Sequence, residues 1–157
     1  MSLFNKFLLL ILTSFPIISS CNSEQVIFNN DILNKNIFFD AVEKSIVIDD
    51  SFPISIKNKI NYVYQNNFKT NGLEGSSNFI FDRFEKTEEL IENGKKVTIK
   101  LVLNVEIFKN KNNSKKILRY NIEEFGQITG DFSVKDYERL VESIENNTIN
   151  SLLKNLN

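Results

Sequence analysis

The side chains that could do chemistry in this sequence are carboxylates, amines, phenols and one thiol. The 157-residue chain contains no His and no Trp, and Cys21 is its only cysteine. Ser-His and Cys-His nucleophilic catalysis, imidazole or thiolate zinc sites and a disulfide framework are therefore excluded. The glycines also lack the sequence context of a phosphate-binding loop. We predict no metal, no cofactor and no enzymatic activity.

The single cysteine lies at the end of an apolar N-terminal segment. Lys6 provides a short basic region, residues 7–13 form an apolar run, and the small residues Ser19 and Ser20 precede Cys21. The run is too short to span a bilayer as a helix, and small residues suit a peptidase cut. These features predict a secretion signal.

The segment that ends at Cys21 resembles the lipobox of bacterial lipoproteins. The resemblance implies cleavage between Ser20 and Cys21, a diacylglyceryl thioether on the cysteine sulfur and usually a third acyl chain, such as palmitate, on the new amino group. Two or three acyl chains anchor a protein effectively permanently. The alternative is an ordinary secretion signal with an incidental cysteine, although a lone free thiol is a liability in an oxidising compartment.

We expect three parts in the chain: a lipoprotein signal peptide over residues 1–20, a lipidated tether over 21–36 and a single α+β domain over 37–157. Lys6 is the only charged residue of the signal peptide, so the mature chain carries 18 basic and 20 acidic side chains. This near balance argues against nucleic-acid binding, which needs a basic face.

A strand and a helix are predicted in the first third of the domain. Residues 43–49 are rich in β-branched side chains and end at polar residues, which favours a strand. A helix then opens at Pro53, with Asp50 or Ser51 as its cap. Its apolar face comprises Ile56, Ile60, Val63 and Tyr64, and its polar face comprises Lys57, Asn58, Lys59, Asn61 and Gln65.

The middle of the domain has the two-residue period of strands. After a polar stretch over residues 66–77, a strand begins at 78–84 and continues toward residue 91. Asn93-Gly94 predicts a type I′ hairpin turn, in which both central residues need a positive φ. Apolar and polar residues then alternate over 97–107, and a further strand covers 117–126.

A second amphipathic helix completes the domain. Ser133, with Asp136 three residues later, resembles a capping box. Apolar residues keep helical spacing from there to the C-terminus. The elements predict an α+β fold: a two-layer sandwich of two helices on a four-stranded, mainly antiparallel sheet, in the order β-α-β-β-β-α.

A lipobox followed by this order of elements resembles the LptE family of lipopolysaccharide-assembly lipoproteins, especially its divergent alphaproteobacterial members. The matching features are the capped helix near Ser51, the two strands and basic loop over 97–127, and the helix from Ser133 to Leu156. The resemblance implies a non-enzymatic outer-membrane lipoprotein, lipid-anchored on the periplasmic face. LptE-like proteins plug the β-barrel LptD, help it assemble and bind lipopolysaccharide.

Lipopolysaccharide phosphates would need exposed Lys or Arg side chains. We select the basic cluster around the loop over residues 109–115 as the candidate contact, while an ordinary solvated hairpin is the alternative reading of the same charges. The cluster comprises Lys109, Lys111, Lys115, Lys116 and Arg119.

Two other functions stay open. An auxiliary lipoprotein of a periplasmic lipid-transport ABC system can also be a small α/β domain, and it would co-purify with an inner-membrane ATPase complex rather than a barrel. A periplasmic hydrolase could use carboxylates alone. Glu123 and Glu124 are the pair whose joint mutation would abolish its turnover.

Overall fold

The computed structural model describes residues 36–109 and 114–157. The signal peptide, Ser20, Cys21, almost all of the tether and Lys111 lie outside these residues. The described elements are β1 (Ile37–Phe39), β2 (Glu43–Ile48), α2 (Ile54–Asn66), β3 (Phe68–Thr70), β4 (Ser76–Ile91), β5 (Gly94–Lys109), β6 (Ser114–Thr129) and α3 (Val134–Leu156).

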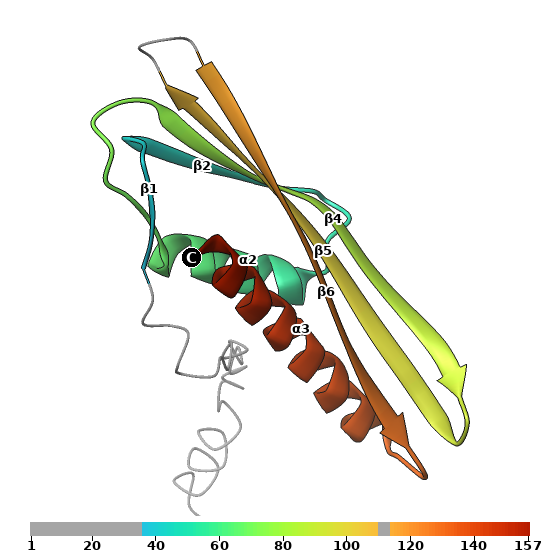
Figure 1. The fold of residues 1–157 in the computed structure, drawn as a ribbon. Helices are drawn as coiled ribbons and strands as arrows, with labels where there is room; N and C mark the ends of the chain where they lie inside the picture. The colour runs from blue at the N-terminus through green and yellow to red at the C-terminus, as the bar shows by residue number, and fades with distance from the viewer. Residues whose placement is uncertain (1–35, 110–113) are drawn as a thin grey trace, which may run out of the picture.

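The predicted α+β fold is confirmed. One sheet has the strand order β2-β4-β5-β6, and α2 and α3 lie on the same side of it (Figure 1). β4, β5 and β6 form an antiparallel meander of 16-residue strands, while β2 pairs in parallel with β4. The sheet is therefore mixed but mainly antiparallel. A register shift between Phe81 and Arg83 in β4 marks a β-bulge, which bends a strand and increases its twist.

A second, two-stranded sheet departs from the predicted order. Ile37 pairs with Phe68 and Phe39 with Thr70, so β1 and β3 are parallel neighbours. The prediction of a polar stretch over 66–77 is wrong at residues 68–70, which form β3, and at residues 76 and 77, which begin β4. Phe68 is fully buried and its ring lies 4.8 Å from that of Phe79. The burial of Phe68 holds β3 in place, although a strand of three residues is too short to show a two-residue period in the sequence.

The core fills the space between the helices and one face of the sheet. Phe79 and Phe81 of β4, Leu101 and Leu103 of β5 and Ile122 of β6 are all buried. They occupy alternate positions along their strands, as a sheet with one covered face requires. The core thus confirms the predicted apolar faces of the β5 and β6 regions.

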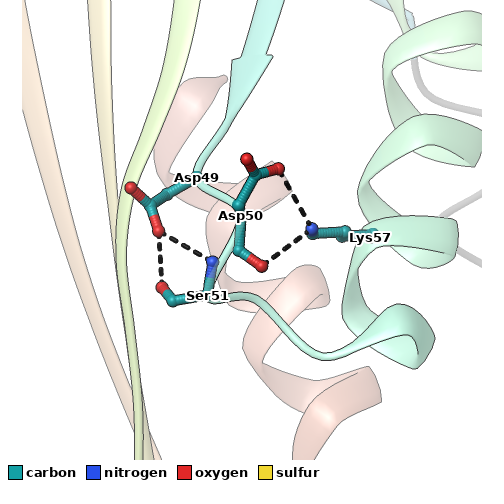
Figure 2. A network of polar contacts seen from close by, with 4 residues as sticks. All are labelled: Asp49, Asp50, Ser51 and Lys57. Atoms are coloured by element: carbon teal, nitrogen blue, oxygen red, sulfur yellow. Dashed lines mark hydrogen bonds and ion pairs between the residues drawn. The ribbon is translucent and has the colours of Figure 1, made fainter.

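The start of α2 differs from the expected capped N-terminus. Pro53 is the N-cap residue, and no side chain caps the helix. Ser51 instead donates its N–H and its hydroxyl to the Asp49 carboxylate, while Lys57 donates to the Asp50 carbonyl oxygen at 3.0 Å (Figure 2). The caps proposed at Asp50 and Ser51 are wrong, because the Ser51 hydroxyl binds Asp49 and the Asp50 carboxylate pairs with Lys57.

The assignment of Lys59 to a solvated face of α2 is also wrong. Lys59 is only 5% exposed, and its amine lies 2.8 Å from the carboxylate of Glu145 in α3. An acidic partner on the neighbouring helix satisfies a charge that the helical pattern alone places in water.

The hairpin between β4 and β5 forms at the predicted place with a different turn. Ile91 pairs with Gly94, so Glu92 and Asn93 are the central residues. Only Asn93 has a positive φ, at 59°, which is not the type I′ conformation. The Asn93 carbonyl oxygen accepts a bond of 2.8 Å from the N–H of Gly130, which ties this turn to the connection between β6 and α3.

The capping box of α3 is confirmed. The Ser133 hydroxyl accepts from the N–H of Asp136 at 3.2 Å, and the Asp136 carboxylate accepts from the N–H of Ser133 at 3.0 Å. These bonds satisfy backbone donors that a helix start leaves unpaired.

Candidate functional site

The strands divide the predicted basic cluster between the two faces of the sheet. Side chains alternate along a strand, so neighbours in sequence point to opposite faces. Lys115 pairs with Phe108 and Arg119 with Asn104, on the face that points away from the helices. Lys116 lies on the opposite face, in register with Ile107. The structure therefore does not gather the predicted residues into one patch.

Lys109 lies at the end of β5 and forms an ion pair with Asp40, in the connection between β1 and β2. The hydrogen bond to Asp40, followed by the negative charge of that carboxylate, raises the pKa of Lys109. Asp40 and Lys109 line a shallow hollow together with Leu73 and Glu74. The amine of Lys109 is thus partly neutralised by its neighbour.

Lys115 is also in an ion pair. Its amine lies 2.6 Å from the Glu106 carboxylate and 5.2 Å from the centre of the Phe108 ring. Arg119 contacts Asn121 through Nε at 3.4 Å. Within the described part of the chain, neither Arg119 nor Lys116 belongs to an ion pair. These two residues offer the least compensated charge of the cluster.

The candidate binding surface is the face of the main sheet that α2 and α3 leave uncovered, which we call the outer face (Figure 1). Register and alternation define its members. They are Glu43, Ser45 and Val47 of β2, Ser76, Asn78, Ile80, Arg83, Glu85, Thr87 and Glu89 of β4, Lys96, Thr98, Lys100, Val102, Asn104, Glu106 and Phe108 of β5, and Lys115, Ile117, Arg119, Asn121, Glu123, Phe125 and Gln127 of β6.

The charges of the outer face are balanced and partly paired across strands. Lys100 lies in register with Glu85 on one side and Glu123 on the other, and its amine is 3.3 Å from the Glu123 carboxylate. Ser45 donates to Asn78 at 2.6 Å in another row. Cross-strand pairs of opposite charge stabilise a sheet, so these pairs help to hold the strands of the outer face together.

Apolar side chains interrupt the polar outer face, and one of them, Val47, lies in register with Ile80. Val47 is 56% exposed, Ile117 57% and Phe125 62%. The amine of Lys96 lies 5.0 Å from the centre of the Phe125 ring. In the sequence, only the alternating polar positions of β5 indicate the outer face. The full width of this face depends on the pairing of four strands, which no single segment shows.

A polar cluster on the helix side of the sheet has no sequence signal. The Tyr137 hydroxyl of α3 donates to the Glu88 carboxylate of β4, and the amines of Lys86 and Lys95 lie 3.3 and 3.7 Å from the same carboxylate. Burial, followed by the hydrogen bond and charge of Glu88, raises the pKa of Tyr137 to about 12. The hydrogen bond from Tyr137 is the first cause that lowers the pKa of Glu88. The cluster fastens the start of α3 to the hairpin.

The two carboxylates considered for hydrolysis lie on opposite faces of β6. Glu123 faces outward toward Lys100, whereas Glu124 accepts a hydrogen bond of 2.5 Å from Ser151 of α3. A pair that acts on one bond must flank it from a shared cleft. Adjacent residues of one strand do not meet this requirement.

Neither a metal centre nor a membrane-spanning helix is found in residues 36–109 and 114–157. No group of three or more ligating side chains occurs there. The helices of these segments also lack the length and apolar content needed to cross a bilayer.

The chain is similar in structure to solved bacterial lipoproteins. No family model and no curated protein sequence matches the chain. Solved structures that are similar include a minor lipoprotein from Acinetobacter baumannii (12% identity, TM-score 0.43, 73% of this chain and 86% of that chain). The rare lipoprotein B from Shewanella oneidensis gives 12% identity and a TM-score of 0.44 over 73% and 92% of the two chains. An uncharacterized lipoprotein B from Nitrosomonas europaea gives 6% identity and a TM-score of 0.49 over 76% and 84%. These structural neighbours are bacterial lipoproteins.

Proposed function

We propose that this protein is a lipid-anchored outer-membrane lipoprotein that partners a β-barrel of the LptD type, as a plug and assembly factor in lipopolysaccharide export. The N-terminal segment that ends at Cys21 supports the anchor. The outer face of the sheet carries the rest of the proposal. The role is one of binding and needs no catalytic group.

The outer face suits the interior of a large barrel. Such a lumen is polar and filled with water. A plug must therefore present hydrogen-bonding and charged groups over a wide area, with opposite charges compensated so that the partner is not repelled. Three 16-residue strands supply the area, and cross-strand pairs such as Lys100 with Glu123 supply the compensation. The buried core behind them, with Leu103 fully enclosed, keeps the surface rigid.

Lipopolysaccharide binding is the second part of the proposal. Its phosphates would be met by the candidate residues Lys109, Lys111, Lys115, Lys116 and Arg119. Arg119 is the residue we expect to contribute most, because Lys109 and Lys115 are already paired with carboxylates. A guanidinium also binds phosphate through two parallel hydrogen bonds.

A pull-down tests the partnership. The tagged full chain is produced in its native host, the outer membrane is solubilised in detergent, and captured proteins are identified by mass spectrometry. We expect a large β-barrel of the LptD type to be captured. Capture of an inner-membrane ATPase complex would support the lipid-transport alternative instead. A lipidated chain that is captured without any barrel would contradict the proposal.

Two variants separate the parts of the proposal. Cys21→Ser removes the acylated sulfur and should release the chain from the membrane. Arg119→Gln should reduce the lipopolysaccharide captured with the chain, whereas the matched control Arg83→Gln, on the same face in β4, should not. Equal capture by both arginine variants would contradict the contact at Arg119.

A further inference from the structure

The strand β6 forms one edge of the main sheet and has a partner on only one side. It pairs with β5 along its whole length, and no other described strand lies beyond it. Within the described residues, no other strand or loop bonds the backbone of β6. A long free edge presents a row of N–H and C=O groups that can pair with another strand.

The charges of β6 are separated along its length. The first half carries Lys115, Lys116 and Arg119, and the second half carries Glu123 and Glu124. An antiparallel copy of the same strand would place each basic half beside an acidic half. A parallel copy would instead place like charges side by side, which destabilises a sheet.

One register satisfies charge and apolar positions together. When Asn121 lies opposite Asn121 of a second copy, Arg119 lies opposite Glu123 and Ile117 lies opposite Phe125. These residues all belong to the outer face. Ile117 and Phe125 are 57% and 62% exposed, and each would be covered by the other. In the neighbouring register, shifted by two residues, Ile117 would face Glu123.

We infer that the free edge of β6 is a self-association surface, on which two copies of this chain pair antiparallel around Asn121 and extend the four-stranded sheet into one of eight strands. A two-fold axis through Asn121 makes the contact the same for both copies, so the association closes as a dimer. The outer face continues across the junction.

On the helix-covered side of the junction, Tyr120 would lie opposite Ile122 of the second copy. Ile122 is already buried in the core of its own chain, so this position contributes little to the contact. Lys116 would lie diagonally from Glu124, within reach of a long side chain. The hydrogen bond from Ser151 orients Glu124 on this face. The inference rests on β6 alone and does not depend on the partnership with a barrel. It pairs Arg119 with Glu123 of the second copy, so a chain in this dimer does not offer Arg119 to lipopolysaccharide.

A cysteine on the proposed axis tests the register directly. Directly opposite Cα atoms in an antiparallel pair lie about 4.5–5.5 Å apart, which is within the range of a disulfide. The full chain with Asn121→Cys, produced in its host membrane and exposed to a mild oxidant, should give a disulfide-linked dimer on a non-reducing gel. The unsubstituted chain controls for linkage through Cys21.

Gln127→Cys is the matched control on the same face of the same strand. In the proposed register the two cysteines would lie about 40 Å apart, at roughly 3.4 Å per residue. This variant should therefore stay monomeric. Absence of the Asn121→Cys dimer would overturn the inference. Equal linkage by Asn121→Cys and Gln127→Cys would also overturn the inference. Random collision, or a barrel strand bound to this edge, would not favour position 121 over position 127.

A charge exchange tests the pair between Arg119 and Glu123. Arg119→Glu and Glu123→Arg each turn two attractive cross-strand pairs into repulsive ones. From the usual energies of such pairs, each variant should weaken self-association at least tenfold. A mixture of the two variants restores both pairs and should form a heterodimer about as stable as the original dimer. Sedimentation of the full chains in detergent measures this. A mixture no more associated than either variant alone would contradict the register.

Discussion

Lys59 of α2 and Glu145 of α3 form an ion pair inside the protein, with Nζ and Oε2 2.8 Å apart. The two residues are 5% and 8% exposed. The Ser55 hydroxyl donates to the other carboxylate oxygen at 3.2 Å. The pair joins the two helices that cover the sheet, and each charge depends on the other for compensation.

The first prediction concerns this pair. Lys59→Met should lower the free energy of unfolding by about 3 kcal/mol or more, since Glu145 becomes an unpaired buried charge. Lys59→Met combined with Glu145→Leu should cost much less, because no charge is then buried. Urea unfolding followed by circular dichroism measures both.

Lys57→Met is the control for that experiment. The Asp50 partner of Lys57 is fully exposed, so this change should alter the free energy of unfolding by no more than about 0.5 kcal/mol. If Lys59→Met combined with Glu145→Leu were as unstable as Lys59→Met alone, the unpaired charge of Glu145 would not be the cause of the loss.

The second prediction concerns the pKa of Tyr137, which is raised to about 12 by burial and by its contact with Glu88. Glu88→Gln should lower this pKa only part of the way toward 10, because burial, the larger cause, remains. Titration of the phenolate absorbance measures the shift. A pKa unchanged by Glu88→Gln would show that the hydrogen bond does not act on the phenol.

The same shift predicts how stability depends on pH. A group whose pKa is higher in the folded state adds stability below its unfolded pKa, here 10.0, and that stability is lost as the pH rises toward the folded value. The difference in the free energy of unfolding between the unsubstituted chain and Tyr137→Phe should therefore shrink between about pH 10 and about 12. A difference that stays constant across this window would contradict the shift.

The third prediction compares two glycines with positive φ. At Gly75, with φ 84°, an added Cβ would lie 2.0 Å from the carbonyl oxygen of Phe108, whereas at Gly130, with φ 78°, nothing lies within 4 Å. Gly130→Ala should cost about 1–2 kcal/mol of stability for its backbone conformation alone. Gly75→Ala should cost clearly more, since backbone must move. Equal melting temperatures for the two variants would contradict the close approach of β4 and β5.

The fourth prediction concerns the two helix starts. Ser133→Ala should cost about 1 kcal/mol, the usual value for a lost N-cap side chain. Ser51→Ala should cost less, because Ser51 does not cap α2 and its N–H bond to Asp49 remains. Thermal unfolding of the two variants distinguishes them. If Ser51→Ala lowered the stability more than Ser133→Ala, Ser51 would cap α2 as the sequence predicted.

Sequence patterns predicted the elements whose evidence is local. The alternation over 97–107 and the Ser133 to Asp136 spacing each lie within one element, and both features were confirmed. The division of Lys115 and Lys116 between two faces also follows from the period of a strand. It was missed because these residues were assigned to a loop and its basic cluster instead of to β6.

Features that depend on distant partners could not be predicted in this way. β1 pairs with β3 about thirty residues later, and Lys59 meets Glu145 across 86 positions. The outer face exists only because β2, β4, β5 and β6 are placed in register. No single segment contains the information for such a surface.

We propose that the outer face lies against a large β-barrel in the envelope. Thr87, on this face and away from the β6 edge, is the position for a photo-crosslinking amino acid in the full chain within living cells. We predict a crosslinked product that contains an LptD-type barrel. If the lipidated chain reaches the outer membrane and irradiation captures no barrel from this position, the account is contradicted.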